Sequence, residues 1–212
     1  MSDTILIPGG RDVRASLDLA SATDVDSAGE RADAVAVACP PHPQRRGHRG
    51  DDRLVAASGA LTERGIDCLR FDYGDWDEGY GESTDTNEAV GWAAERYDRV
   101  GLFGFSFGGT VALVAAASRP DLAGVCALAP TGRLNPDADA AEALSEVVER
   151  GVPVRVLYAT RDSTADWEPV VERAGELGVE TVAFESDHFF VGRAGDVGEA
   201  VAAFLVPRLR DA

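Results

Sequence analysis

From residue 34 onward, short apolar runs that are typical of buried strands alternate with segments of helical pattern. The strand-like runs are Ala34–Cys39, Cys68–Tyr73, Arg99–Phe105, Gly124–Ala129, Val154–Thr160 and Thr181–Glu185. The helical patterns occupy Asp51–Arg64, Thr86–Tyr97, Phe107–Ser118, Asp137–Arg150, Glu168–Leu177 and Val197–Arg210. This alternation predicts an α/β fold, in which a mostly parallel central sheet carries helices on both faces.

The N-terminal segment has a different pattern. Thr4–Ile7 and Ala15–Ala20 flank the turn signal Pro8–Asp12, which predicts a β-hairpin. The polar stretch Asp24–Asp33 then leads into the first buried strand. With no internal repeat and no low-complexity linker, we expect residues 1–212 to form a single domain.

One motif lies between a buried strand and an apolar helix: Gly104-Phe105-Ser106-Phe107-Gly108-Gly109. A nucleophile elbow needs such a sharp strand-to-helix turn, with small residues two positions before and after the serine. The helix N-terminus also supplies N–H groups and a positive dipole where an oxyanion would form. A phosphate-binding turn is the alternative, but the motif lacks the Lys-Ser/Thr of a P-loop. Ser106 is therefore the candidate nucleophile.

A serine nucleophile needs a base and a carboxylate that orients the base. His188 follows the last predicted strand, and Asp162 follows the strand before it. Because the carboxyl ends of the parallel strands converge, we expect both side chains to reach Ser106. Asp166 and Glu168 are nearer the next helix, whose N-terminus we expect them to cap or charge. The order Ser106, Asp162, His188 is the one described for the α/β-hydrolase fold.

These motifs give the chain a resemblance to the α/β-hydrolase superfamily over essentially its whole length, in the compact form without a cap domain. It is most similar to small dienelactone-hydrolase-like hydrolases, on three elements: Pro41-His42-Pro43, Gly104–Gly108 and Asp187–Phe190. Dienelactone hydrolases proper carry a cysteine at the position of Ser106, and relatives usually have a histidine where this chain has Pro40. The resemblance implies cleavage of an ester, thioester or related acyl bond in a small molecule, without a cofactor.

The oxyanion hole of this fold combines the N–H after the nucleophile with one from the loop after an early strand. The first is the Phe107 N–H. In the second loop Pro41 and Pro43 cannot donate, which leaves the His42 N–H as first choice and Gln44 as second. The sequence assigns no catalytic role to the His42 side chain.

The chain is strongly acidic, with 37 Asp and Glu, 20 basic residues that are all arginine, and a formal net charge of −17. Such a surface repels nucleic acid and anionic membranes, so we expect neither as a partner. The absence of lysine favours a protein adapted to concentrated salt, where screening suppresses self-repulsion. Three widely spaced cysteines in apolar runs indicate buried thiols, and no signal peptide is visible, which together predict a cytoplasmic protein.

The segment Gly74–Thr84 carries several acidic residues but fails the calcium-loop template, so we expect a solvated acidic rim and no metal site. Because this segment follows a strand, Asp75, Asp77, Glu78 and Glu82 should border the cleft and disfavour anionic substrates. The stretch between Pro130 and Val154 leaves no room for a lid, which predicts short acyl groups. Two alternatives remain: a non-catalytic protein that uses the cleft for binding, and an acyltransferase or amidase with the same triad.

Overall fold

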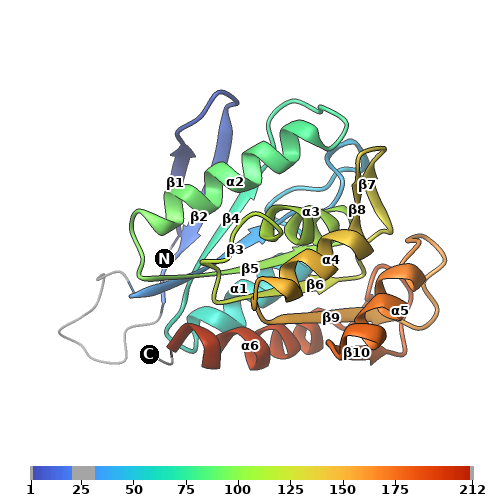
Figure 1. The fold of residues 1–212 in the computed structure, drawn as a ribbon. Coiled ribbons are helices and arrows are strands. Elements are labelled where there is room, and N and C mark those ends of the chain that lie inside the picture. The colour runs from blue at the N-terminus through green and yellow to red at the C-terminus, as the bar shows by residue number, and fades with distance from the viewer. Residues whose placement is uncertain (1, 21–31, 211–212) are drawn as a thin grey trace.

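The computed structural model describes residues 2–20 and 32–210 of the chain, and its centre is one eight-stranded sheet (Figure 1). The strands of this sheet are β1 (Ser2–Ile7), β2 (Val13–Asp18), β3 (Ala34–Cys39), β4 (Asp67–Asp72), β5 (Arg99–Phe105), β6 (Gly124–Leu128), β9 (Val154–Ala159) and β10 (Glu180–Phe184). Their spatial order is β1-β2-β4-β3-β5-β6-β9-β10. From β4 to β10 all neighbours are parallel, whereas β2 is antiparallel to both β1 and β4. The predicted, mostly parallel sheet is confirmed.

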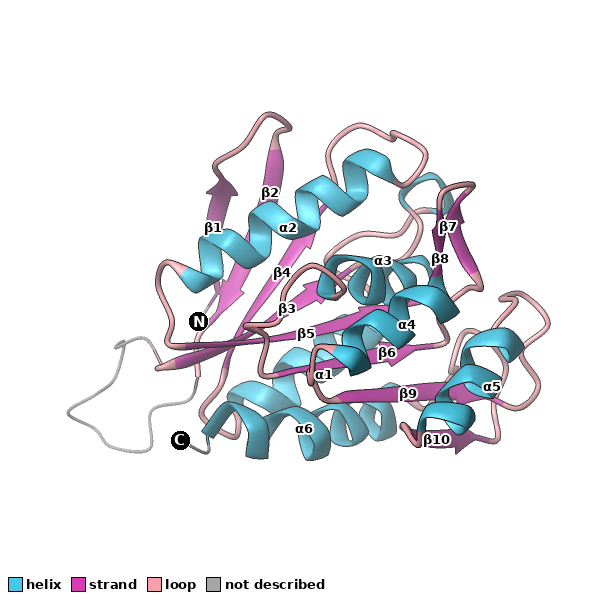
Figure 2. Ribbon diagram, viewed as in Figure 1, coloured by secondary structure: helices cyan, strands magenta, loops and turns pink. Residues whose placement is uncertain are grey.

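Helices cover both faces of this sheet, as predicted (Figure 2). They are α1 (Asp52–Thr62), α2 (Tyr80–Ala94), α3 (Phe107–Ala116), α4 (Ala140–Glu149), α5 (Glu168–Leu177) and α6 (Ala194–Arg210). Helices α2 to α5 pack into one apolar core, and α1 with α6 pack into the other. No helix in the described ranges is both long enough and apolar enough to cross a membrane.

The sequence of β3 shows how the two cores are separated. Its valines, Val35 and Val37, belong to the core under α2 to α5, and its alanines, Ala36 and Ala38, belong to the core under α1 and α6. This division follows from the two-residue period of a strand. Gly198 permits the close approach of α6 to α1. A Cβ at this position would lie 2.6 Å from the Ala56 carbonyl oxygen, so a larger residue would push the helices apart.

The N-terminal hairpin is confirmed, with Ile7 opposite Val13, although its second strand begins two residues before the predicted Ala15. Most of the polar stretch Asp24–Asp33 lies outside the described residues.

Helix α6 begins at Ala194, three residues before the predicted Val197, and two other elements differ more from the prediction. Helix α2 begins at Tyr80 and not at Thr86, because Gly79 adopts a φ of +92° and the buried Glu82 carboxylate accepts its N–H at 2.8 Å. A short antiparallel pair, β7 (Arg133–Asn135) with β8 (Ala138–Asp139), precedes α4 where continuous helix from Asp137 was predicted. Asp139 ends this pair and caps α4 with its side chain.

The sheet brings four strand ends to one edge. Cys39 at the end of β3 lies opposite Gly104 in β5, and Phe184 at the end of β10 lies opposite Ala159 in β9. The segments that follow these strands carry His42, Ser106, Asp162 and His188. In open α/β sheets, this carboxyl edge is where ligands bind.

Candidate active site

Ser106 occupies a strained turn between β5 and α3. Its φ and ψ are +56° and −123°, a conformation that non-glycine residues rarely adopt. The turn is held on both sides, because the Ser106 N–H donates to the Leu128 carbonyl at 2.8 Å and its own carbonyl accepts from the Gly109 N–H at 2.8 Å. The serine side chain is thereby presented at the start of α3, as a nucleophile elbow requires.

Two glycines permit this turn. A Cβ at Gly104 would lie 2.0 Å from the Gly108 carbonyl oxygen, and a Cβ at Gly108 would lie 2.3 Å from the Cys39 carbonyl oxygen. The strand, the helix and the end of β3 therefore meet through backbone atoms, which explains the small residues on either side of Ser106.

His188 joins Ser106 to Asp162. Its Nε2 lies 2.9 Å from Ser106 Oγ, and its Nδ1 lies 2.6 Å from Asp162 Oδ2. An ionised carboxylate only accepts hydrogen bonds, so this arrangement favours the tautomer of a neutral imidazole with its proton on Nδ1, whose Nε2 lone pair faces the serine hydroxyl. The His188 side chain is 6% exposed and that of Asp162 is fully buried, so water is largely excluded from the hydrogen bond between these two residues.

Asp162 is fixed by its second oxygen as well. Oδ1 accepts from the Thr164 N–H at 2.8 Å and from the Ala165 N–H at 3.0 Å, which leaves Oδ2 to His188. Asp166 is exposed, and its carboxylate forms no hydrogen bond with His188. It does not cap α5 either, since the N-cap position is Trp167, whereas Glu168 lies in the first turn as expected.

Phe107 and His42, the two predicted donors of an oxyanion hole, lie beside each other. Their rings are 4.9 Å apart, and within residues 2–20 and 32–210 neither backbone N–H has a hydrogen-bond acceptor. Gln44 differs, because its N–H donates to His42 Nδ1 at 3.3 Å. The His42 ring also stacks on Trp76 at 4.5 Å and forms a wall of the site. Burial, followed by the charge of Arg45, lowers the pKa of His42 below its ordinary value.

A pocket of about 650 Å³ opens over Ser106. This volume is in the range of small-molecule sites. Aromatic side chains form much of its wall, among them Trp76, Phe107 and the half-exposed Phe189. Leu134, from the β7–β8 pair, closes another side. Trp76 and Leu134 were not anticipated; a large aromatic residue just after the carboxyl end of β4 was the available signal for Trp76.

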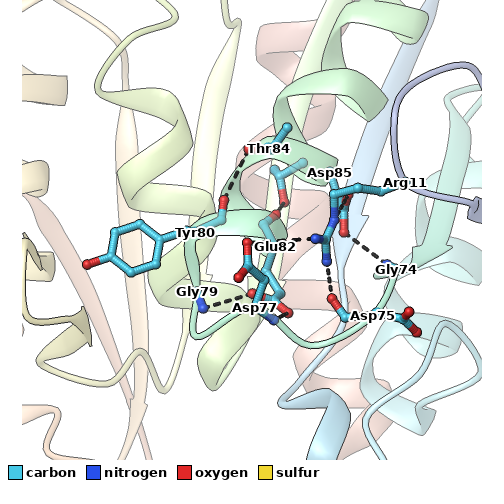
Figure 3. Close-up of polar contacts among 10 residues, drawn as sticks. Arg11, Gly74, Asp75, Asp77, Gly79, Tyr80, Glu82, Thr84 and Asp85 are labelled. Carbon is cyan, nitrogen blue, oxygen red and sulfur yellow. Dashed lines mark hydrogen bonds and ion pairs between the residues drawn. The ribbon is translucent and has the colours of Figure 1, made fainter.

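The predicted acidic rim is wrong, since none of its carboxylates lines the pocket. Figure 3 shows three residues of this rim, Asp75, Asp77 and Glu82, with their polar contacts. Glu82 is buried and accepts from the N–H groups of Asp77 and Gly79 at 3.0 and 2.8 Å. Arg11, from the β1–β2 turn, donates to Asp85 at 2.8 Å and to the Asp75 carbonyl oxygen. Glu82 and Asp85, which lies outside the predicted rim, thus brace the loop that carries Trp76, whereas Asp75, Asp77 and Glu78 are exposed.

The charged groups that do line the pocket are mostly basic: Arg45, Arg46, Arg53 and Arg133, with Asp51 as the one carboxylate among the described lining residues. The sequence signal for two of them was the basic pair Arg45-Arg46, one residue after Pro41-His42-Pro43 in an otherwise acidic chain. The net charge of the whole chain concealed this local reversal.

The thiols take no part in the site. Cys39, Cys68 and Cys126 are free and fully buried, as predicted, and burial raises the pKa of each to about 12. A thiol in this state is not a nucleophile near neutral pH.

Comparison with known proteins agrees with this architecture. The family of X-Pro dipeptidyl-peptidases (S15 family) matches residues 71–154, a stretch that includes Ser106 but ends before Asp162 and His188. An uncharacterized protein of Rickettsia prowazekii is 22% identical over 190 residues, which span 81% of this chain and 78% of that protein.

Solved structures resemble the whole chain. A serine hydrolase without a lid from Xanthomonas campestris superposes with a TM-score of 0.80 at 22% identity, covering 100% of this chain and 96% of that one. A dienelactone hydrolase from Anabaena variabilis superposes with a TM-score of 0.76 at 19% identity, covering 99% of each chain. The chain therefore has the α/β-hydrolase fold without a lid domain. The family match covers the segment that contains Ser106, and these neighbours share the fold of the whole chain.

Proposed function

We propose that this protein hydrolyses a small ester, thioester or related acyl compound through an acyl-enzyme at Ser106. The observation that carries the proposal is the His188 ring, which lies within hydrogen-bond distance of both Ser106 Oγ and Asp162 Oδ2. A nucleophile, a base and an orienting carboxylate in this arrangement form the triad that activates a serine.

The reaction has two halves. Ser106 Oγ attacks the acyl carbon while its proton passes to His188 Nε2, and the N–H groups of Phe107 and His42 stabilise the negative oxygen. His188 then returns the proton to the leaving group, whose bond to the acyl carbon breaks. Water repeats the sequence on the acyl-enzyme, giving its proton to His188, and the carboxylic acid is released as Ser106 regains its hydrogen.

The direct test compares wild type with Ser106→Ala and a matched Ser118→Ala control on 4-nitrophenyl acetate. Ser118 lies just after α3, away from the pocket, so this control should keep wild-type turnover. Ser106→Ala should lose hydrolysis by several orders of magnitude, while an unchanged circular-dichroism spectrum shows that it folds. Full turnover by folded Ser106→Ala would contradict the mechanism.

The alternative of a non-catalytic binding protein predicted an incomplete triad, and the two hydrogen bonds of His188 argue against it. An acyltransferase or amidase would use the same groups and differ only in acceptor or leaving group. Product analysis with added alcohols and amines separates these outcomes, and we propose that water is the acceptor.

Short acyl groups fit the pocket, because no lid domain extends it into a tunnel. A series of esters from acetyl to palmitoyl should show the highest kcat/KM at the short end. A preference for palmitoyl would show that the pocket extends into a tunnel and would contradict the prediction.

The same acidic chain suggests the setting in which the enzyme works. We propose a cytoplasm rich in salt, supported by the net charge of −17 and by three free, buried thiols, which suit a reducing compartment. Repulsion among the carboxylates of the chain extends over about 30 Å at 0.01 M salt but over only about 3 Å at 1 M salt. The melting temperature should therefore fall on transfer from molar to millimolar KCl, and an unchanged value would contradict the proposal.

A further inference from the structure

The pocket over Ser106 is lined mainly by basic residues, although the protein as a whole is strongly acidic. The chain carries −17 overall, yet four arginines and a single aspartate line this pocket. A field that is negative over most of the surface repels anions, so a local basic lining has to act at short range.

Two of these arginines have structural partners. Arg53 forms an ion pair with Asp51, donates to the Phe189 carbonyl at 2.9 Å and stacks over Phe105 at 4.4 Å. Arg133 lies 3.5 Å from the Asp139 carboxylate and is 60% exposed, so its charge is only partly compensated. Arg53 therefore belongs to the wall, and Arg133 is partly available to a ligand.

Arg45 and Arg46 are exposed, and among residues 2–20 and 32–210 no carboxylate forms an ion pair with either. This is unusual in the molecule, because most arginines outside the pocket have such a partner, as Arg70 has Asp18 and Arg155 has Glu180. The two uncompensated charges lie where a substrate would enter.

The loop that carries this pair is fixed close to the reacting serine. The His42 carbonyl accepts from the N–H groups of Arg45 and Gly47 at 2.9 and 3.0 Å, which closes the segment on itself. His42 lies against Phe107, the residue after the serine. A group attached to an acyl compound at Ser106 can therefore meet Arg45 and Arg46 without rearrangement of the backbone.

From this arrangement we propose that the substrate carries an anionic group, a carboxylate or a phosphate, which Arg45 and Arg46 bind with help from Arg133. Guanidinium groups recognise both kinds of anion through charge-assisted hydrogen bonds. This inference rests on the proposed hydrolase function and specifies its substrate class. It replaces the expectation of an acid-rimmed cleft that would exclude anions.

The test uses esters that differ only in charge. One pair, the 4-methylumbelliferyl esters of butyric acid and of succinic acid, places a methyl or a carboxylate at the end of the acyl chain. A second pair, methyl 4-acetoxybenzoate and 4-acetoxybenzoate, places the charge on the leaving group. A third, acetyl-pantetheine and acetyl-4′-phosphopantetheine, adds a phosphate. At 0.1 M salt, at least one anionic compound should have a higher kcat/KM than its neutral partner. The pair that shows this difference identifies which part of the substrate carries the anion and whether it is a carboxylate or a phosphate.

Arginine variants then assign the preference to residues. In Arg45→Gln, Arg46→Gln and Arg133→Gln, the ratio of anionic to neutral kcat/KM should fall, by about fivefold for a unit charge about 4 Å from the anion in water. The preference should also weaken at 1 M salt. Arg173→Gln is the control, since Arg173 lies in α5, outside the pocket, paired with Glu176, and both rates should be unchanged.

The outcomes separate this inference from the proposed function. If wild type hydrolyses the neutral esters at least as well as every anionic partner, and no pocket variant alters the ratios, the anionic substrate is refuted while the hydrolase stands. If wild type hydrolyses no member of any pair, the proposed function fails and this inference fails with it.

Discussion

Gly104→Ala tests whether the elbow is set by contact between backbones. The added Cβ would lie 2.0 Å from the Gly108 carbonyl oxygen, 2.4 Å from its carbon and 2.8 Å from the Gly109 nitrogen. Ordinary contact begins near 3.4 Å, so β5 and the first turn of α3 must separate by about 1.4 Å. No flexible side chain is there to yield.

The separation should affect both stability and rate. Overpacking of this kind costs about 1–3 kcal/mol, which lowers the melting temperature of a chain of this size by about 2–12 °C. Because Ser106 moves relative to His188, kcat/KM on 4-nitrophenyl acetate should fall by about 100-fold, the usual effect of a misplacement of about 1 Å.

Gly91→Ala is the matched control. Gly91 lies inside α2, and a Cβ there meets nothing within 4 Å. Alanine should raise stability by about 0.5–1 kcal/mol and leave the rate unchanged. The reasoning is refuted if Gly104→Ala melts and turns over like wild type.

Two further predictions concern the groups around Ser106. Asp162→Asn should lower kcat by about 10⁴-fold, since an amide at this position favours the wrong tautomer of His188, whereas Asp166→Asn should have little effect. Steady-state kinetics of both variants on one ester measure the difference. A large loss in Asp166→Asn with none in Asp162→Asn would refute the assignment of the triad carboxylate. Arg45→Gln should raise the pKa of His42 towards its ordinary value, because a nearby positive charge disfavours the imidazolium. An NMR titration of His42 measures this, and an unchanged or lower pKa would show that Arg45 does not act on the site.

The positions of the strand ends account for most of what the sequence predicted correctly about the site. Ser106, Asp162 and His188 could be expected to meet because the carboxyl ends of parallel strands converge, and their distances in the structure agree with that geometry. Here the hydrophobic pattern alone determined which loops face one another.

The predictions that were wrong have one physical cause. A local sequence pattern does not determine how a side chain is oriented or which distant residues it contacts. The first turn of α2 contains Gly81, a poor helix former, and is stabilised by Glu82 bonding back to Gly79. The β7–β8 pair is too short for any period to show. The acidic rim failed because the local sequence gives the charges of its residues but not their orientation: Glu82 is buried, and Asp75, Asp77 and Glu78 are exposed outside the pocket lining.

Covalent labelling of Ser106 tests the central claim most directly. A fluorophosphonate reacts with a serine only when a base activates it, and it loses fluoride as the Oγ–P bond forms. Intact-mass measurement should show one adduct per wild-type chain, and peptide mapping should place it on Ser106. Ser106→Ala should remain unlabelled, and His188→Ala should label far more slowly. An adduct on another residue, or no adduct on folded wild type, would contradict the account.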